Sequence, residues 1–195
     1  MASPLITVAA LLGAGQGSRY AGPTHKLLAD LDGATVFERS LAAVTAAGFD
    51  RVIVVTGAVS LPIPAGAANV TIRHNPEWER GQATSLQAAI EAAAELGAES
   101  ISVGLADQPF VTTDAWRAVH DAPPECRIVL AEYPDGSGPN PVRLDRSVWP
   151  LLPIDGDEGA RSVIREHPLW CCRVTCVGSV ADIDTLEDLD RWRSC

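Results

Sequence analysis

Ile6-Thr7-Val8-Ala9-Ala10-Leu11-Leu12 runs directly into Gly13-Ala14-Gly15-Gln16-Gly17-Ser18-Arg19, and this junction of an apolar run with a glycine-rich stretch decides the fold. An unbroken apolar run of this length is typical of a parallel strand that is buried on both faces of its sheet. The other apolar runs bounded by turn residues are Arg51–Thr56, Ile101–Leu105, Arg127–Ala131 and Cys172–Val177. We expect a strand at each of them.

Helical patterns separate these predicted strands. Thr35-Val36-Phe37-Glu38 is a capping box that predicts a helix ending at Gly48, and Thr84-Ser85-Leu86-Gln87 predicts another ending at Gly97. Further helices are expected after Thr113, Gly156 and Thr185. Strands that alternate with helices of about 12 residues form right-handed βαβ units. The sequence therefore predicts one α/β domain over residues 1–195, a Rossmann-like three-layer sandwich with a mainly parallel central sheet.

The composition is that of an acidic globular protein. Hydrophobic residues make up 47% of the chain, and the formal net charge is −10. This charge argues against a nucleic-acid or acidic-membrane surface, because those partners require a basic footprint. No apolar stretch approaches the roughly 20 residues of a membrane span, and the first residues lack the positive charge of a signal peptide. We expect a cytoplasmic protein.

The cysteines are odd in number and lie mostly in apolar surroundings. They are Cys126, Cys171, Cys172, Cys176 and Cys195. Strand alternation would place Cys172 and Cys176 on one face and Cys171 on the other, which argues against a metal cluster. We expect reduced core cysteines without a disulfide framework, which also fits a reducing cytoplasm.

The glycine-rich stretch after the first strand is a candidate phosphate site. Glycines allow backbone N–H groups to approach a phosphate closely, and Arg19 and Lys26 would add positive charge. Lys26 is the only lysine in the chain. The spacing matches neither a P-loop nor a clean dinucleotide fingerprint. We interpret the neighbouring His25 as a solvated loop histidine, the alternative being contact with a phosphate or with the acceptor.

Asp107 is a candidate metal ligand, because Leu105-Ala106-Asp107-Gln108-Pro109 directly follows a predicted buried strand. The carboxyl ends of parallel strands meet at one edge of the sheet, so Asp107 should lie near the glycine-rich stretch. There it could hold a Mg²⁺ that bridges phosphates, the alternative being a turn or capping aspartate.

Further motifs follow in a fixed order. They are Asn75-Pro76-Glu77-Trp78, Gly81, Thr84-Ser85-Leu86, the Asp107 motif, Asn140-Pro141-Val142, Gly156-Asp157-Glu158-Gly159-Ala160-Arg161 and Asp182-Ile183-Asp184-Thr185-Leu186-Glu187-Asp188-Leu189. Together with the glycine-rich stretch, this ordered set resembles the MobA-like NTP transferases, and among them most closely the molybdenum cofactor cytidylyltransferases. The resemblance spans nearly the whole chain.

The resemblance implies a magnesium-dependent nucleotidyltransferase that moves an NMP unit onto a phosphorylated acceptor and releases pyrophosphate. Its implied catalytic residues are Asp107, Lys26 and Arg19. Its implied nucleotide-binding residues are Leu12, Gly13, Ala14, Gly15, Gly17, Ser18, Arg19, Lys26, Asn75, Ser85 and Asp107. Its implied acceptor-binding residues are Asn140, Gly159 and Arg161, and its implied metal ligands are Asp107 and Asp184. Asp182 is an alternative ligand, and Asp184 could equally cap the helix beside Thr185.

The resemblance also suggests substrates. Gly13-Ala14-Gly15 is closer to the A-A-G of the cytidylyltransferase branch than to the A-G-G of the guanylyltransferase branch, which favours CTP over GTP. The implied acceptor is molybdopterin or the molybdenum cofactor, with transient contact to a molybdoenzyme or its chaperone. Alternatives are a guanylyltransferase, a transferase acting on a sugar-1-phosphate, 2-phospholactate or a phosphonate, and a non-catalytic nucleotide-binding accessory protein of an oxidoreductase.

Overall fold

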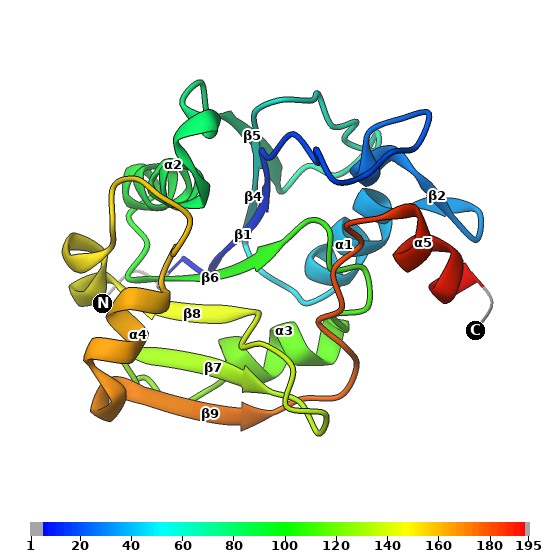
Figure 1. The fold of residues 1–195 in the computed structure, drawn as a ribbon. Helices are drawn as coiled ribbons and strands as arrows, with labels where there is room; N and C mark the ends of the chain where they lie inside the picture. Colours follow the sequence, from blue (N-terminus) through cyan, green and yellow to red (C-terminus); the bar gives the residue numbers. More distant parts are fainter. Residues whose placement is uncertain (1–5, 194–195) are drawn as a thin grey trace.

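A mixed sheet with helices on both faces forms the centre of the computed structural model, which describes residues 6–193 (Figure 1). Within these residues the strands are β1 Val8–Gly13, β2 Asp30–Leu31, β3 Ala34–Thr35, β4 Arg51–Thr56, β5 Val70–His74, β6 Ser100–Leu105, β7 Ile128–Glu132, β8 Val142–Asp145 and β9 Cys171–Thr175. The large sheet has the order β5-β4-β1-β6-β8-β7-β9, while β2 and β3 form a small hairpin. Of the described strands of the large sheet, only β8 runs antiparallel to its neighbours.

Helices cover both faces of this sheet. The α-helices of the described residues are α1 Val36–Thr45, α2 Gln82–Glu95, α3 Thr113–His120, α4 Arg161–Glu166 and α5 Leu186–Arg193. Short 3-10 helices are η1 Lys26–Leu28, η2 Trp78–Arg80, η3 Arg146–Leu151 and η4 Pro168–Trp170. Between residues 6 and 193, no helix is both long and apolar enough to cross a bilayer.

The two faces of the sheet have separate hydrophobic cores. One contains Phe37 of α1, Trp116 of α3 and Leu189 of α5, and the other contains Leu86 of α2 and Val163 of α4. All six residues of β1 are buried, as expected of a central parallel strand. The predicted three-layer sandwich with a mainly parallel sheet is therefore confirmed.

Two helix starts test the capping predictions. Thr35 and Glu38 form the reciprocal hydrogen bonds of a capping box at the start of α1, as predicted. The prediction that Thr84 opens the second helix is wrong, because α2 already begins at Gln82 with Gly81 as its N-cap. The Thr84 hydroxyl instead donates to the carbonyl oxygen of Gly81 at 2.9 Å, inside the first turn.

The strand β5 is absent from the sequence-based prediction. Its sequence, Val-Thr-Ile-Arg-His, has few apolar residues, and Ile72 is 53% exposed. It lies at the edge of the sheet and pairs with β4 alone. An edge strand needs little apolar surface, so the apolar-run criterion misses it.

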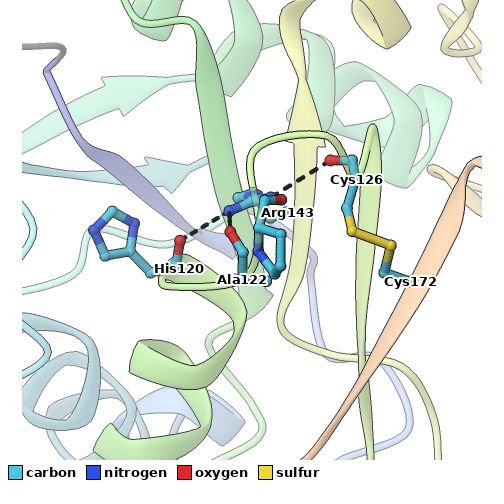
Figure 2. The surroundings of a disulfide bond; sticks show 6 residues. His120, Ala122, Cys126, Arg143 and Cys172 are labelled. Carbon is cyan, nitrogen blue, oxygen red and sulfur yellow. Dashed lines mark hydrogen bonds between the residues drawn. A yellow bond between two sulfur atoms is a disulfide. The ribbon is translucent and has the colours of Figure 1, made fainter.

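The prediction that the cysteines are reduced is wrong for two of them. Cys126 and Cys172 form a disulfide that joins the segment before β7 to β9 (Figure 2). The two cysteines are 46 residues apart, so their spacing in the sequence does not predict the bond. They meet because β7 and β9 are neighbouring parallel strands, with Val129 opposite Cys172. Cys171 and Cys176 are free thiols and lie against opposite cores, as alternation predicted. Cys195 lies outside the described residues.

Arg143 of β8 also holds the segment between α3 and β7 in place. Its guanidinium donates to the backbone carbonyl oxygens of His120, Ala122, Pro123 and Cys126, at distances of 2.9, 2.6, 2.7 and 3.4 Å (Figure 2). The α3–β7 connection is thus tied both to β8 and, through the disulfide, to β9.

Candidate active site

A cavity of about 480 Å³ opens at the carboxyl ends of β1 and β6. Leu12 and Leu105 are register partners at the ends of these strands, and both line the cavity. From β1 the chain proceeds to β4 and β5 on one side and then returns to β6 on the other. The cavity therefore lies at the switch in strand order, where open α/β sheets bind their ligands.

Lys26, Asp107 and Asp184 form a charged cluster in the floor of this cavity. The Lys26 Nζ donates to Asp107 Oδ2 at 2.6 Å and to Asp184 Oδ1 at 2.7 Å. Arg19, which is largely exposed, reaches the second oxygen of Asp184 at 2.8 Å. The side chains of Lys26, Asp107 and Asp184 are only 11%, 19% and 20% exposed, so these charges interact more strongly than a surface ion pair.

The environment of Lys26 preserves its charge. Burial alone would lower the pKa of the ammonium group, but the charge of Asp107 and the hydrogen bonds to Asp107 and Asp184 outweigh it, so that the pKa is raised. Lys26 therefore keeps its positive charge in its position between the two carboxylates.

Backbone and side-chain hydrogen bonds bring Asp184 from the far end of the chain to Asp107. The Ile183 backbone N–H donates to the carbonyl oxygen of Asp107 at 2.9 Å. Beside it, Gln108 Nε2 donates to Asp182 Oδ1 at 2.9 Å. Burial, together with the negative charge of Asp107, raises the pKa of Asp182. The segment before α5 is thus tied to the loop after β6.

His25 braces the glycine-rich loop, contrary to the interpretation that it is merely solvated. Its Nδ1 accepts a hydrogen bond from the Leu27 backbone N–H at 3.2 Å, so its Nε2 carries the proton and donates to the Gly15 carbonyl oxygen at 3.0 Å. Burial lowers the pKa of His25, which favours this neutral form. Gly17, at φ +64, lets the loop pass close to the stem of Lys26.

The opposite wall of the cavity comes from η2, α2 and the segment before α4. It contains the predicted residues Ser85 and Arg161. It also contains residues to which the sequence analysis gave no role in the site, although three of them lie in its motifs, namely Trp78, Gly81 and Asp157, together with Glu79 and Gln82. The segment before α4 docks on the start of α2, because Gly156 O accepts from Ala83 N at 2.9 Å and Asp157 Oδ1 accepts from Gln82 N at 3.3 Å. These contacts occupy the first amides of α2, which are therefore not free to bind an anion. The spacing of the sequence motifs does not predict that the segment before α4 contacts the start of α2.

Most of the predicted residues meet in or beside the cavity. Its lining includes Leu12, Ala14, Gly15, Gly17, Ser18, Arg19, Lys26, Ser85, Asp107, Arg161, Asp182 and Asp184, and Gly13 lines an adjoining cavity.

Three predicted residues lie elsewhere. Asn75 is buried and donates to the hydroxyls of Thr84 and Ser85 at 2.8 and 3.0 Å, so it braces α2. Asn140 donates to Gln108 Oε1 at 3.0 Å and supports the side chain that holds Asp182. Gly159 packs beside Gln82, outside the cavity lining.

The oxygen atoms of the charged cluster are suitable ligands for a divalent cation. Asp107 Oδ1 is buried and accepts no hydrogen bond from any residue between 6 and 193. Within the same residues no three His, Cys, Asp or Glu side chains form a complete metal site. A pair of carboxylates is nonetheless sufficient where phosphate oxygens and water supply the other ligands, as is usual for Mg²⁺. The pair formed by Asp107 and Asp184 fits a metal of that kind.

Comparison with known proteins finds similar proteins that cover nearly the whole chain. Residues 9–170 match the model of the MobA-like NTP transferase domain. The chain is 28% identical over 206 residues to the purine catabolism protein PucB of Bacillus subtilis, covering 99% of this chain and 98% of PucB. The structure of Rv0371c from Mycobacterium tuberculosis is 26% identical with a TM-score of 0.78, covering 99% of this chain and 100% of that one.

Two further structures bear on the metal and on the fold. Rv0371c has also been solved in complex with manganese, at 27% identity and a TM-score of 0.76, covering 98% of this chain and 99% of that one. The inositol-1-phosphate CTP transferase of T. maritima has the same fold at 14% identity and a TM-score of 0.69, covering 98% and 97% of the two chains. With the family model matched over most of its length, the chain belongs to the MobA-like NTP transferase domain family and is a nucleotidyltransferase.

Proposed function

We propose that this nucleotidyltransferase transfers CMP from CTP to a phosphorylated acceptor, molybdopterin or its molybdenum-loaded form, and that residues 1–195 act as one cytoplasmic domain. The observation that carries the reaction class is the Lys26–Asp107–Asp184 cluster beneath the glycine-rich loop. The choice of CTP and of the acceptor rests on the sequence motifs. The cytoplasmic location is an expectation from the sequence alone, and the Cys126–Cys172 disulfide argues against it, because disulfides are rare in a reducing cytoplasm.

The glycine-rich loop is the proposed seat of the triphosphate. A side chain at Gly15 would meet no atom of residues 6–193 within 4 Å, so within these residues the loop backbone is open to a ligand there. Backbone N–H groups of such loops bind phosphate oxygens, and Arg19 can add a bidentate contact. His25 holds the loop at Gly15, which fixes the direction of these amides.

The charge of the cavity wall supports a metal-bound nucleotide. Its carboxylates are Glu79, Asp107, Asp157, Asp182 and Asp184, whereas its cations are Arg19, Lys26 and Arg161. Because carboxylates exceed cations, a triphosphate would be repelled without a further positive charge. Asp107 and Asp184 would hold a divalent cation, magnesium in our proposal, which supplies charge neutralisation at the phosphate oxygens. The manganese complex of Rv0371c supports this choice of ion class.

The opposite wall is the proposed acceptor side. Arg161 would bind the acceptor phosphate, and Asn140 and Gly159 would act indirectly through Gln108 and Gln82. An acceptor phosphate oxygen attacks the α-phosphorus in line, the bond to the bridging oxygen breaks, and pyrophosphate leaves. The protein contributes positioning and charge rather than a nucleophile. A molybdoenzyme or its chaperone would receive the product by transient contact.

Pyrophosphate release tests this proposal. Purified protein with Mg²⁺ is incubated with molybdopterin, or its molybdenum-loaded form, and with CTP, GTP, ATP or UTP in turn. We expect release with CTP, lowered about 100-fold or more by Asp107→Asn, because a metal contributes several kcal/mol to phosphoryl transfer. Asp114→Asn is the matched control, since this exposed aspartate lies on α3 and does not line the cavity.

Other outcomes identify the alternatives. Release with GTP alone would indicate a guanylyltransferase. Release only when a sugar-1-phosphate, 2-phospholactate or a phosphonate replaces the pterin would keep the reaction class and change the acceptor. Nucleotide binding without turnover on any of these acceptors would contradict the proposed reaction and favour the accessory-protein alternative.

A further inference from the structure

We propose that Lys26 is an internal counter-ion that holds Asp107 and Asp184 in the free protein, releases them to a divalent cation, and then turns its ammonium group to the phosphates. This inference rests on the proposed function, because it concerns the same cavity. It adds an exchange of positive charge that precedes the reaction.

The ammonium group lies where the proposed cation would bind. Lys26 Nζ is 2.6 Å from Asp107 Oδ2 and 2.7 Å from Asp184 Oδ1. A divalent cation held between the two carboxylates would occupy the position of the ammonium group, with shorter contacts of about 2.0–2.6 Å to their oxygens. Two positive charges cannot share that position, so the side chain of Lys26 must leave before the carboxylates can bind a metal.

The carboxylates stay in place when the lysine leaves. Asp184 keeps its contact with Arg19 at 2.8 Å, and its neighbour Ile183 remains bound to the carbonyl oxygen of Asp107. Asp107 Oδ1, which is buried and accepts no hydrogen bond from residues 6–193, gives the cation an additional oxygen. A divalent cation would restore the charge balance that the ammonium group provides in the free protein.

The new position of the ammonium group lies within reach of its stem. Lys26 lines both the main cavity and the adjoining one beneath the glycine-rich loop. Its Cγ is 3.1 Å from the position of a Cβ built on Gly17, so the stem runs directly along the loop. Rotation about the outer side-chain bonds can therefore carry Nζ from the carboxylates toward loop-bound phosphates without moving the backbone.

Metal binding in the absence of nucleotide tests the exchange. We expect Lys26→Met to bind Mn²⁺ at least tenfold more tightly than the parent, measured by electron paramagnetic resonance or calorimetry, because the competing cation is gone. Arg73→Met is the matched control, since Arg73 also lies between two carboxylates, Glu91 and Glu95, but away from this cavity. Its Mn²⁺ affinity should equal that of the parent. Unchanged or weaker binding by Lys26→Met would overturn the proposal.

A second measurement uses the parent protein and avoids any effect of the substitution on folding. Because Lys26 is the only lysine, isotope-labelled lysine gives a single side-chain NMR signal. Titration with Mg²⁺ should move this signal and increase the mobility of the Cε group, with half of the change reached at the Kd of the metal. A signal that keeps its position and mobility while Mg²⁺ binds would show that Lys26 stays on the carboxylates, against the proposal.

These results are separate from the test of the proposed function. Pyrophosphate release by the parent, combined with an unmoved Lys26 signal, would remove the exchange and leave the nucleotidyltransferase reaction standing. A moved signal without pyrophosphate release on any acceptor would support the exchange and contradict the proposed reaction.

Discussion

His25 shows how one side chain prepares the site. It connects the Gly15 carbonyl to the helical turn that carries Lys26, and it does so as a neutral ring whose pKa burial has lowered. A charged ring would carry a proton on Nδ1 and could no longer accept from Leu27. The loop and the lysine thus depend on the protonation state of one residue.

Stability should depend on pH through His25. Between the ordinary histidine pKa of about 6.5 and the lowered value, the unfolded chain binds a proton that the folded chain does not. The free energy of unfolding should therefore fall as the pH decreases below about 6.5. In His25→Gln this contribution is absent, so urea unfolding from pH 8 to pH 5 should show a shallower decline than in the parent. Equal declines in the two proteins would contradict this role.

Arg143 is a purely structural residue in this account. Replacing it with Met would remove this donor from four backbone carbonyl oxygens at the end of α3 and in the α3–β7 connection, of which that of Pro123 keeps a hydrogen bond from the Cys126 N–H. We expect a loss of about 3 kcal/mol in the free energy of unfolding, measured with urea, because buried unsatisfied groups are costly. Arg165→Met is the control, since Arg165 is 65% exposed and its pair with Glu158 contributes little. Equal stability of the two variants would refute the assignment.

At the scale of elements, the start of α2 shapes the opposite wall of the cavity, which is the proposed acceptor side. Gly81 precedes this helix with φ +107 and ψ 173, a conformation open essentially to glycine alone. A Cβ built there would lie 2.4 Å from the Gly156 carbonyl oxygen, in the segment that docks on α2. Glycine is therefore required both by backbone angle and by close approach.

Gly81→Ala should separate the docked segment from α2. We expect a loss of about 3 kcal/mol in stability, from backbone strain together with the clash at Gly156, and weaker binding of ligands to the cavity. Gly97→Ala after the same helix is the matched control, because Gly97 has φ +76 but no atom of the described residues, 6–193, lies within 4 Å of its Cβ position. That variant should lose about 1 kcal/mol. Urea unfolding and nucleotide titration measure both effects, and a Gly81→Ala protein as stable as Gly97→Ala would disprove the close approach.

At the scale of the whole molecule, the disulfide closes a long loop of the β7–β9 half. It joins Cys126 to Cys172 across 46 residues of sequence. Constraining a loop of that length in the unfolded chain gives about 4 kcal/mol in the loop-entropy model. The disulfide therefore links the segment before β7 covalently to β9, the strand from which the chain continues to Asp182 and Asp184.

Reduction of the disulfide should lower the stability of the protein. We expect dithiothreitol to lower the free energy of unfolding by about 2–4 kcal/mol. The double variant Cys126→Ser, Cys172→Ser should be insensitive to dithiothreitol, because it lacks the bond. Peptide mapping of the unreduced protein should recover Cys126 and Cys172 in one linked species, and their recovery as separate thiols would exclude the disulfide.

The sequence by itself determined the layered fold and the chemistry of the floor of the cavity. Long apolar runs bounded by glycine predict buried parallel strands, and parallel strands deliver their following loops to one edge. That reasoning is enough to bring Arg19, Lys26 and Asp107 together, because each follows one of two adjacent central strands, β1 and β6. Asp184 required the family's motif order, since nothing local in the sequence links it to Asp107.

Only the tertiary structure decided the remaining partners. Three polar loop residues illustrate this, namely Asn75, Asn140 and His25. The local sequence around each of them is compatible both with a side chain that faces a ligand and with one that braces the protein. The Cys126–Cys172 bond, the edge strand β5 and the docking of Gly156 on α2 likewise depend on contacts between distant segments. Local patterns report burial and backbone angle, whereas the partner of a polar group is fixed by which distant elements pack together.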